Sequence, residues 1–157
     1  MNKLRFLYII AIFTIVLVAC KKTEVKKDDP KVDPPTMTAQ EYLSDTTWKI
    51  TALTADGVGD VWNNPFFVKP CNKDNTYYFK LTNILTSYDT PSKCNATDPD
   101  STSGPYKLIE NNKRMFLDLT VGTIQIQDTT DVVVIDKTTL KLNFNYSGFP
   151  GVITFGH

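Results

Sequence analysis

Histidine is nearly absent from this chain of 157 residues, because the single one is His157 at the last position. A histidine-based catalytic triad, a three-histidine zinc site and a histidine general base are therefore excluded, apart from any function of a terminal side chain. The sequence also lacks a phosphate-binding loop and a dinucleotide-binding fingerprint. We therefore expect a protein that is not an enzyme and that carries no cofactor.

Clustered basic charge is missing as well. The chain carries 17 Lys plus Arg and 17 Asp plus Glu, for a formal net charge of zero. From Thr38 onward the acidic residues outnumber the basic ones by 13 to 10. A nucleic-acid-binding surface needs a basic patch or stripe, so we expect no nucleic-acid partner.

Long apolar runs are limited to residues 6–16, which follow a short basic stretch. A run of this length suits a secretion signal and is shorter than the roughly 20 residues of a membrane-spanning helix. It leads into Leu17, Val18, Ala19 and Cys20, which resemble the lipobox of bacterial lipoproteins. The resemblance implies cleavage before Cys20 and lipidation of its thiol with palmitate-like chains. The alternative is an ordinary membrane anchor with a chance cysteine.

Three segments follow from this interpretation: a signal peptide at 1–19, lipidated Cys20 with a flexible tether to residue 37, and a folded domain at 38–157. The tether is charged, contains prolines and has too few large apolar groups to offset its ordering entropy. Two or more acyl chains hold a protein firmly on a membrane. Lys21 stands where an aspartate could act as an inner-membrane retention signal, so we expect the outer membrane, in either leaflet.

The composition of the domain favours strands. It is rich in threonine and holds 15 aromatic residues, and both are typical of β-sheets. One short helical turn is expected at Thr38, where Glu41 completes a capping box. Beyond it, Trp48 and Ile50 alternate with polar residues, as in a half-buried strand, until residues 57–60 break the pattern. Candidate strands are 45–54, 75–81, 84–88, 104–110, 114–119, 122–127, 131–136, 139–146 and 152–155.

Short strands with regular turn signals predict an antiparallel meander closed into a barrel or sandwich. The chain between residues 43 and about 145 also resembles the lipocalin-like lipoproteins of Bacteroidota. The resemblance rests on the order of five phrases: the strand opening at Trp48, the segment 71–79, the second cysteine Cys94 with an Asp-Pro pair, the segment 103–108, and the segment 136–142. It implies an all-β fold, an up-and-down meander closed into an eight-stranded lipocalin-like barrel. The chain departs from the family pattern in its 61–70 loop and its C-terminus.

Cys71 and Cys94 are the two cysteines left once Cys20 is lipidated. An even pair in an exported protein predicts a disulfide, with free or metal-binding thiols as the alternative. The family resemblance implies the same pairing. Closing a loop of about 24 residues would stabilise the fold by roughly 3 kcal/mol in the chain-entropy model.

Asp98 and Asp100, with Asn95 nearby in the sequence, form a group of side-chain oxygens that could bind a metal ion. A calcium site is one interpretation of such a cluster, because calcium prefers carboxylate and amide oxygens. A polar turn around Pro99 is the other, and we expect no metal site.

Two groups of aromatic residues are candidates for ligand binding. The inward-facing positions of the predicted strands form either a packed core or the lining of a cavity, because an eight-stranded barrel can be filled or can hold one small ligand. The 61–70 loop carries aromatics that either plug the barrel or form a contact patch. The strand group is Trp48, Tyr77, Phe79, Tyr106 and Phe144, and the loop group is Trp62, Phe66 and Phe67.

The function expected from these features is that of an outer-membrane-anchored lipoprotein whose barrel binds a small hydrophobic or amphipathic molecule. An open cavity of a few hundred Å³ would support this expectation, and a barrel filled by side chains would contradict it. The alternative is a non-catalytic structural or interaction lipoprotein that docks an envelope protein through its loop aromatics.

Overall fold

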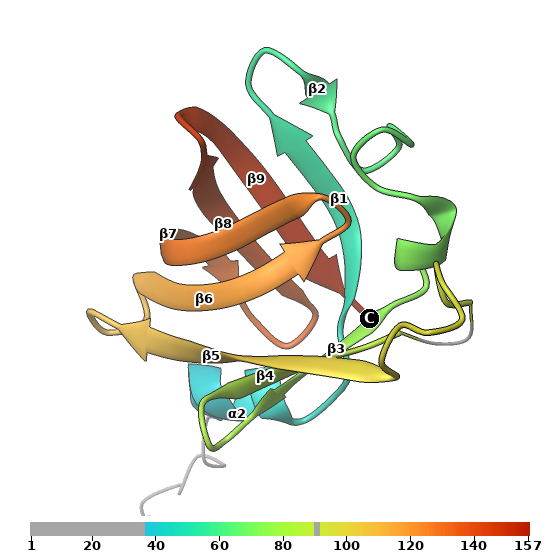
Figure 1. Ribbon diagram of the computed structural model, residues 1–157. Helices are drawn as coiled ribbons and strands as arrows, with labels where there is room; N and C mark the ends of the chain where they lie inside the picture. Colours follow the sequence, from blue (N-terminus) through green and yellow to red (C-terminus); the bar gives the residue numbers. More distant parts are fainter. Residues whose placement is uncertain (1–36, 90–91) are drawn as a thin grey trace, which may run out of the picture. The chain divides into compact units, whose positions relative to one another are not determined.

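The computed structural model describes residues 37–89 and 92–157 (Figure 1). The predicted signal peptide, the predicted lipidation site Cys20 and the predicted tether, except for its last residue, lie outside the described residues. Within the described ranges, no helix combines the length and hydropathy that a membrane span requires.

The described domain is an antiparallel β-sheet of nine strands with one short α-helix. Along the sheet, the strands from β3 to β9 follow one another in chain order, and β1 then lies between β9 and β2. The expected all-β meander is therefore confirmed. The elements are α2 (Ala39–Ser44), β1 (Lys49–Ala55), β2 (Gly59–Asp60), the 3-10 helix η2 (Pro70–Asn72), β3 (Thr76–Lys80), β4 (Ile84–Tyr88), β5 (Ser101–Ile109), β6 (Arg114–Val121), β7 (Ile124–Ile135), β8 (Thr139–Tyr146) and β9 (Phe149–Gly156).

The sheet curls until its two ends meet at one point. β1 pairs with β9 along its whole length, and its neighbour Trp48 forms an isolated antiparallel bridge with Tyr77 of β3. Two backbone hydrogen bonds make the bridge, from Trp48 N to Tyr77 O at 2.7 Å and from Tyr77 N to Trp48 O at 2.8 Å. Eight strands thus surround one interior, and the two-residue β2 is an addition that the sequence did not predict.

One pair of predicted strands is wrong. The segments 122–127 and 131–136 are parts of a single strand, β7, which pairs with β6 from Ile124 to Asp131. The intervening polar residues stay in the sheet because Thr130 is buried and its hydroxyl donates to the Met115 carbonyl at 3.0 Å. Joining the two segments leaves eight long strands.

One end of the barrel, which we call the closed end, holds α2 and the β3–β4, β5–β6 and β7–β8 turns (Figure 1). The predicted capping box is present, since the Thr38 side chain accepts from the Glu41 amide and the Glu41 carboxylate accepts from the Thr38 amide. Leu43 of α2 is buried, and its carbonyl accepts a hydrogen bond from Trp48 Nε1 at 3.0 Å. The helix therefore seals this end through the same tryptophan that closes the sheet.

Aromatic side chains fill the centre of the barrel. Phe79 lies edge-to-face against Tyr106 and Phe155, at centroid distances of 5.0 and 5.8 Å. Tyr77 contacts Phe155 in the same way at 5.6 Å. Such pairs are more favourable than burial alone. The predicted inward residues Trp48, Tyr77, Phe79 and Tyr106 are all essentially inaccessible to solvent, so they form a packed core.

Candidate functional site

The opposite end of the barrel, which we call the mouth, is crossed by the loop of residues 61–70. The loop follows β2, and the amides of its first two residues, Val61 and Trp62, both donate to the Leu53 carbonyl of β1 at 2.9 Å. Further along, the Phe67 carbonyl accepts from the amide of Thr123 in the β6–β7 turn at 3.2 Å. The loop is thus fixed on two sides of the mouth and divides it.

Contact between this loop and the β6–β7 turn depends on Gly122. Its φ of +60° lies in the left-handed region that side chains disfavour. A side chain on Gly122 would also collide with the Phe67 carbonyl oxygen. The loop therefore packs directly on the backbone of the turn.

The three loop aromatics point in different directions. Trp62 is buried with 9% of its surface exposed, and the Lys73 ammonium lies 5.7 Å from the centre of its ring. Phe67 is half-buried, whereas Phe66 is 90% exposed. Trp62 and Phe67 therefore pack into the mouth, whereas Phe66 faces solvent, and its function as a contact residue stays a prediction.

On one side of the loop lies a pocket of about 190 Å³, which we call the apolar pocket. Its rim is partly open, since Val58 is 45% and Phe149 is 55% exposed. Two of the predicted ligand residues, Phe67 and Phe144, belong to it. The lining comes from the β1–β2 and β8–β9 hairpins, the loop and the start of β7: Ala55, Val58, Val61, Phe67, Ile124, Phe144, Tyr146 and Phe149.

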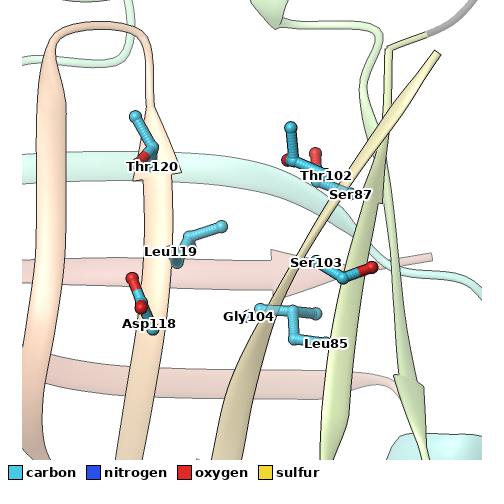
Figure 2. A pocket seen from close by; sticks show the side chains of 8 residues that line it. All are labelled: Leu85, Ser87, Thr102, Ser103, Gly104, Asp118, Leu119 and Thr120. Carbon is cyan, nitrogen blue, oxygen red and sulfur yellow. The ribbon is translucent and has the colours of Figure 1, made fainter. Parts of the chain in front are cut away.

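On the other side of the loop, the barrel wall is split. β5 pairs with β4 from Ser101 to Pro105 but with β6 only from Tyr106 to Ile109. The two strands are still in close contact at Gly104, where a Cβ atom would lie 2.5 Å from the Asp118 carbonyl oxygen, and they separate beyond it, between Thr102 and Thr120. The resulting slit has a volume of about 320 Å³. Figure 2 shows Asp118, Leu119 and Thr120 on one bank and residues 102–104 on the other, with Leu119 pointing into the gap.

Two further pockets lie beside the slit, and we call the three compartments together the polar groove. A middle compartment of about 260 Å³ shares Ser87, Thr102 and Thr120 with the slit. An outer compartment of about 240 Å³ shares Asn72, Asp98 and Gly122 with the middle one and reaches Phe66 and Phe67.

The predicted disulfide is present, and it forms part of this groove. Cys71 and Cys94 are bonded, with their Cα atoms 5.2 Å apart. Cys94 and its neighbour Asn95 line the outer compartment. The bond therefore holds the loop after β4 against the segment before β3, and both segments line part of the groove.

Buried oxygen atoms without hydrogen-bond donors lie in the middle compartment. Asn75 Oδ1 and Asp89 Oδ1 are both inaccessible to solvent and unpartnered, and both residues line this compartment. A third such atom, Asp74 Oδ1, belongs to the carboxylate whose other oxygen accepts from the Ser92 amide at 3.1 Å. Buried polar groups without partners are rare in proteins, so these atoms mark an unusual place.

The cluster considered for calcium is a polar turn. Asp98 accepts a hydrogen bond from the Asn95 amide at 2.9 Å. Asp100 forms an ion pair with Lys93, and the hydrogen bond and charge of that lysine lower the pKa of the Asp100 carboxyl. Among the described residues, no group of three or more His, Cys, Asp or Glu side chains is placed to hold a metal ion.

His157 lies at the closed end, far from the mouth in the fold. Its ring stacks on Trp48 with 4.2 Å between the centroids. The two ring nitrogens face the carbonyls of Thr47 and Lys137, at 3.1 and 2.8 Å. These contacts tie the end of β9 to two neighbouring segments.

The sequence did not predict most of the residues that line the mouth. Val58, Val61, Ile124, Tyr146 and Phe149 complete the apolar pocket, yet they sit at strand ends and turns where alternation gives no signal. The split in the wall had one local indication, the Gly104-Pro105 pair inside β5. Glycine and proline within a strand often mark a bend or a place where pairing ends.

Comparison with known proteins gives a family and similar solved structures. A model of the lipocalin-like domain family matches residues 46–142, which is more than half of the chain. No curated protein matches the chain. Among solved structures, a redesigned β-barrel is similar, with 17% identity, a TM-score of 0.46, and coverage of 78% of this chain and 98% of that one.

Proposed function

Because this chain belongs to the lipocalin-like domain family, we propose that it binds a small apolar or amphipathic molecule at the mouth of its barrel. The observation that carries the proposal is the apolar pocket, whose volume is about 190 Å³. Its rim leaves Val58 and Phe149 substantially exposed. Covering such surface is favourable by roughly 25 cal/mol per Å² of apolar area removed from water.

The ligand site is placed at the mouth and not at the centre of the barrel. Phe79, Tyr106 and Phe155 pack against one another in the centre, which counts against the ligand cavity inside the barrel that the sequence suggested, so we propose the mouth instead. The apolar pocket is smaller than the roughly 300–1,000 Å³ of typical ligand sites. It therefore suits a small ring or the apolar end of a larger amphipathic molecule whose polar part stays outside.

The location is part of the same proposal. The apolar run at 6–16 and the lipobox-like residues before Cys20 support a lipid anchor, and Lys21 supports the outer membrane. A charged tether would let the domain work at the membrane surface without being embedded in it. In this arrangement the protein binds its ligand without converting it, which agrees with the lack of internal histidines.

A matched pair of valine variants tests the site. Val58 on the pocket rim and Val133 on β7 are similarly exposed, at 45% and 48%, but only Val58 lines the apolar pocket. We expect Val58→Arg to weaken binding of the apolar probe N-phenyl-1-naphthylamine about tenfold or more, because a charge at the rim must be desolvated. Val133→Arg should bind like the unmodified protein. Fluorescence titration measures both, and equal effects or no saturable binding would contradict the proposal.

A second candidate is an interaction lipoprotein that docks an envelope protein. The observation in its favour is Phe66, whose side chain is 90% exposed beside the mouth. Large exposed aromatics are common anchors of protein interfaces. Cross-linking in intact cells would separate the candidates, because Phe66→Ser should abolish a specific adduct while Leu81→Ser, at an exposed site in the β3–β4 turn, should keep it.

A further inference from the structure

The closed end of the barrel contains the single histidine of the chain, His157, which follows the last residue of β9. Its imidazole ring stacks on Trp48, with 4.2 Å between the ring centroids. Trp48 is the residue whose backbone bridge to Tyr77 closes the sheet, and its side chain is fully buried. His157 therefore packs directly on the residue at which the barrel closes.

Both ring nitrogens of His157 face hydrogen-bond acceptors. Nδ1 lies 3.1 Å from the Thr47 carbonyl oxygen, and Nε2 lies 2.8 Å from the Lys137 carbonyl oxygen. A carbonyl oxygen can only accept a hydrogen bond, and a neutral imidazole carries one N–H donor and one acceptor nitrogen. The neutral ring can thus satisfy only one of the two carbonyls. The protonated ring has two N–H donors and can satisfy both.

Two further effects distinguish the charged ring from the neutral one. In the neutral ring, the nitrogen without a hydrogen directs its lone pair at a carbonyl oxygen, and two acceptors at this distance repel each other. Hydrogen bonds from a charged donor are also stronger than those between neutral groups, and an aromatic face such as that of Trp48 attracts a cation. This geometry therefore suits the protonated form of His157.

The charged groups around His157 have both signs. The titratable residues on the elements that pack against the ring are Tyr42 and Asp45 at α2, Lys49 on β1, and Asp136 and Lys137 in the β7–β8 turn. The carboxylates favour a positive ring, whereas the lysines disfavour it. A backbone hydrogen bond from Thr138 lowers the pKa of the Asp136 carboxyl, so this group stays ionised while histidine titrates. The two carbonyls, and not the sign of the nearby charge, therefore distinguish the two forms of the ring.

Water reaches the ring freely. His157 is exposed and lines an open hollow of about 360 Å³ beside the end of α2. Its protonation can therefore follow the pH of the surrounding solution without any opening of the barrel.

We propose that His157 is a pH-sensitive clamp on the closed end of the barrel. At mildly acidic pH the protonated ring holds the end of β9 to the segment before β1 and to the β7–β8 turn, through the carbonyls of Thr47 and Lys137. As the pH rises through the range in which histidine titrates, between about pH 5 and 8, the ring loses one N–H and one of the two contacts is released. The clamp lies at the closed end and does not depend on the function proposed for the mouth.

The direction of the effect on stability follows from proton binding. The folded protein offers the second ring proton a carbonyl partner at a fixed distance, and the unfolded chain does not. Where the folded state binds more protons than the unfolded state, stability falls as the pH rises. The contribution of the clamp is therefore fully present at the acidic end of the histidine range and is lost towards its alkaline end.

Thermal unfolding of the purified full-length protein at about pH 5.5 and about pH 8 tests the proposal. His157→Phe keeps an aromatic ring over Trp48 and removes both nitrogens. We expect the unmodified protein to unfold about 3 °C above this variant at the lower pH and to lose at least half of that difference at the higher pH. Groups that both proteins carry cancel in the comparison, and no second histidine contributes.

A charge variant and a spectroscopic measurement separate the clamp from an ion pair. Asp45→Asn removes the carboxylate that shares the hollow with His157, and we expect it to keep the pH-dependent difference because the ring nitrogens face carbonyls. In proton NMR spectra, hydrogen-bonded ring N–H groups exchange slowly enough with water to be seen. We expect two such signals from His157 at the lower pH and one at the higher pH.

Three outcomes would overturn the proposal. The first is an equal difference between the unmodified protein and His157→Phe at both pH values, and the second is a larger difference at the higher pH. The third is loss of the pH dependence in Asp45→Asn, which would assign the effect to an ion pair with that carboxylate. The variants of this test leave the apolar pocket unchanged, so its own test with Val58→Arg stands separately.

Discussion

The two ends of the barrel differ in whether their buried polar groups have hydrogen-bond partners. At the closed end, Gln40 Nε2 donates to the Tyr106 hydroxyl at 2.7 Å, and that hydroxyl donates to the Lys80 carbonyl at 2.8 Å. The Trp48 indole is paired with the Leu43 carbonyl in the same region. At the mouth, by contrast, oxygens of Asn75 and Asp89 are buried without donors.

The aromatic residues show the same contrast. Trp48 at the closed end is fully buried, whereas Phe66 at the mouth is 90% exposed. A side chain that is packed on all sides contributes to stability, and one that faces solvent contributes little until something covers it. The comparison teaches that the closed end is the scaffold of this barrel and that the mouth is where a ligand is expected.

Replacement of the two aromatics should show the largest difference between the ends. We expect Trp48→Ala to lower the free energy of unfolding by about 3–5 kcal/mol, because it leaves a large cavity and removes the bond to Leu43. Phe66→Ala should change it by no more than about 0.5 kcal/mol, as expected for an exposed site. Urea unfolding followed by circular dichroism measures both. Similar losses in the two variants would contradict the division of the barrel into scaffold and site.

Removing the disulfide should weaken the mouth selectively. The bond closes a loop with a sequence separation of 23. We expect Cys71→Ala combined with Cys94→Ala to lower the free energy of unfolding by about 3 kcal/mol. Hydrogen exchange should rise in the loops around the groove and stay unchanged in α2. Equal increases at both ends would show that the mouth is not an independent region.

Gly122 tests whether the loop across the mouth is fixed by the β6–β7 turn. We expect Gly122→Ala to cost about 2 kcal/mol or more, since both its positive φ and the Phe67 carbonyl oppose a side chain. Gly57→Ala is the control, because its φ is also positive but nothing lies within 4 Å of the new atom. It should cost only about 1 kcal/mol. Thermal unfolding compares the two, and an equal cost would argue against the contact.

The smallest effect concerns ionisation at the closed end. Burial raises the pKa of Tyr106 from 10.0 to about 12, although the hydrogen bond from Gln40 acts in the opposite direction. The neutral phenol is therefore favoured by folding. Its contribution to stability is fully present below pH 10 and is lost as the pH rises towards 12.

Ultraviolet titration at the phenolate band measures this effect. In the unmodified protein one tyrosine step should fall near pH 12, and Tyr106→Phe should remove it while lowering the free energy of unfolding by about 1 kcal/mol. Tyr88→Phe, at a partly exposed tyrosine of β4, should leave the late step in place. Loss of the late step in Tyr88→Phe would show that Tyr106 is not the residue shielded by the closed end.

The sequence predicted the closed end better than the mouth. Thr38 and Glu41 stand three residues apart, and Trp48, Tyr77 and Phe79 follow strand alternation, so local rules describe them. The disulfide was predictable because the domain holds two cysteines. Each of these features depends on neighbours in sequence or on simple counting.

The mouth depends on contacts between distant segments. Val58 and Phe149 line the same apolar pocket, and Asn75 and Thr120 line the same compartment of the groove. No local pattern encodes such neighbours, because they result from the curl of the sheet. The fusion of two predicted strands into β7 shows the same limit, since Thr130 stays in the strand through its bond to Met115 on β6.

The pairing of β1 with β9 also sets the order in which this barrel can be completed. Residues 49–55 find their partners at 151–156, so the two strands are separated by nearly the whole folded domain. Pairing between residues so far apart in the sequence slows folding, because the entropic cost of closing the long loop is met before the favourable contacts form. Because the chain is synthesised from its N-terminus, β1 cannot pair with β9 until the last strand has been made. Any factor that binds the chain before it has folded therefore encounters β1 without its partner strand β9.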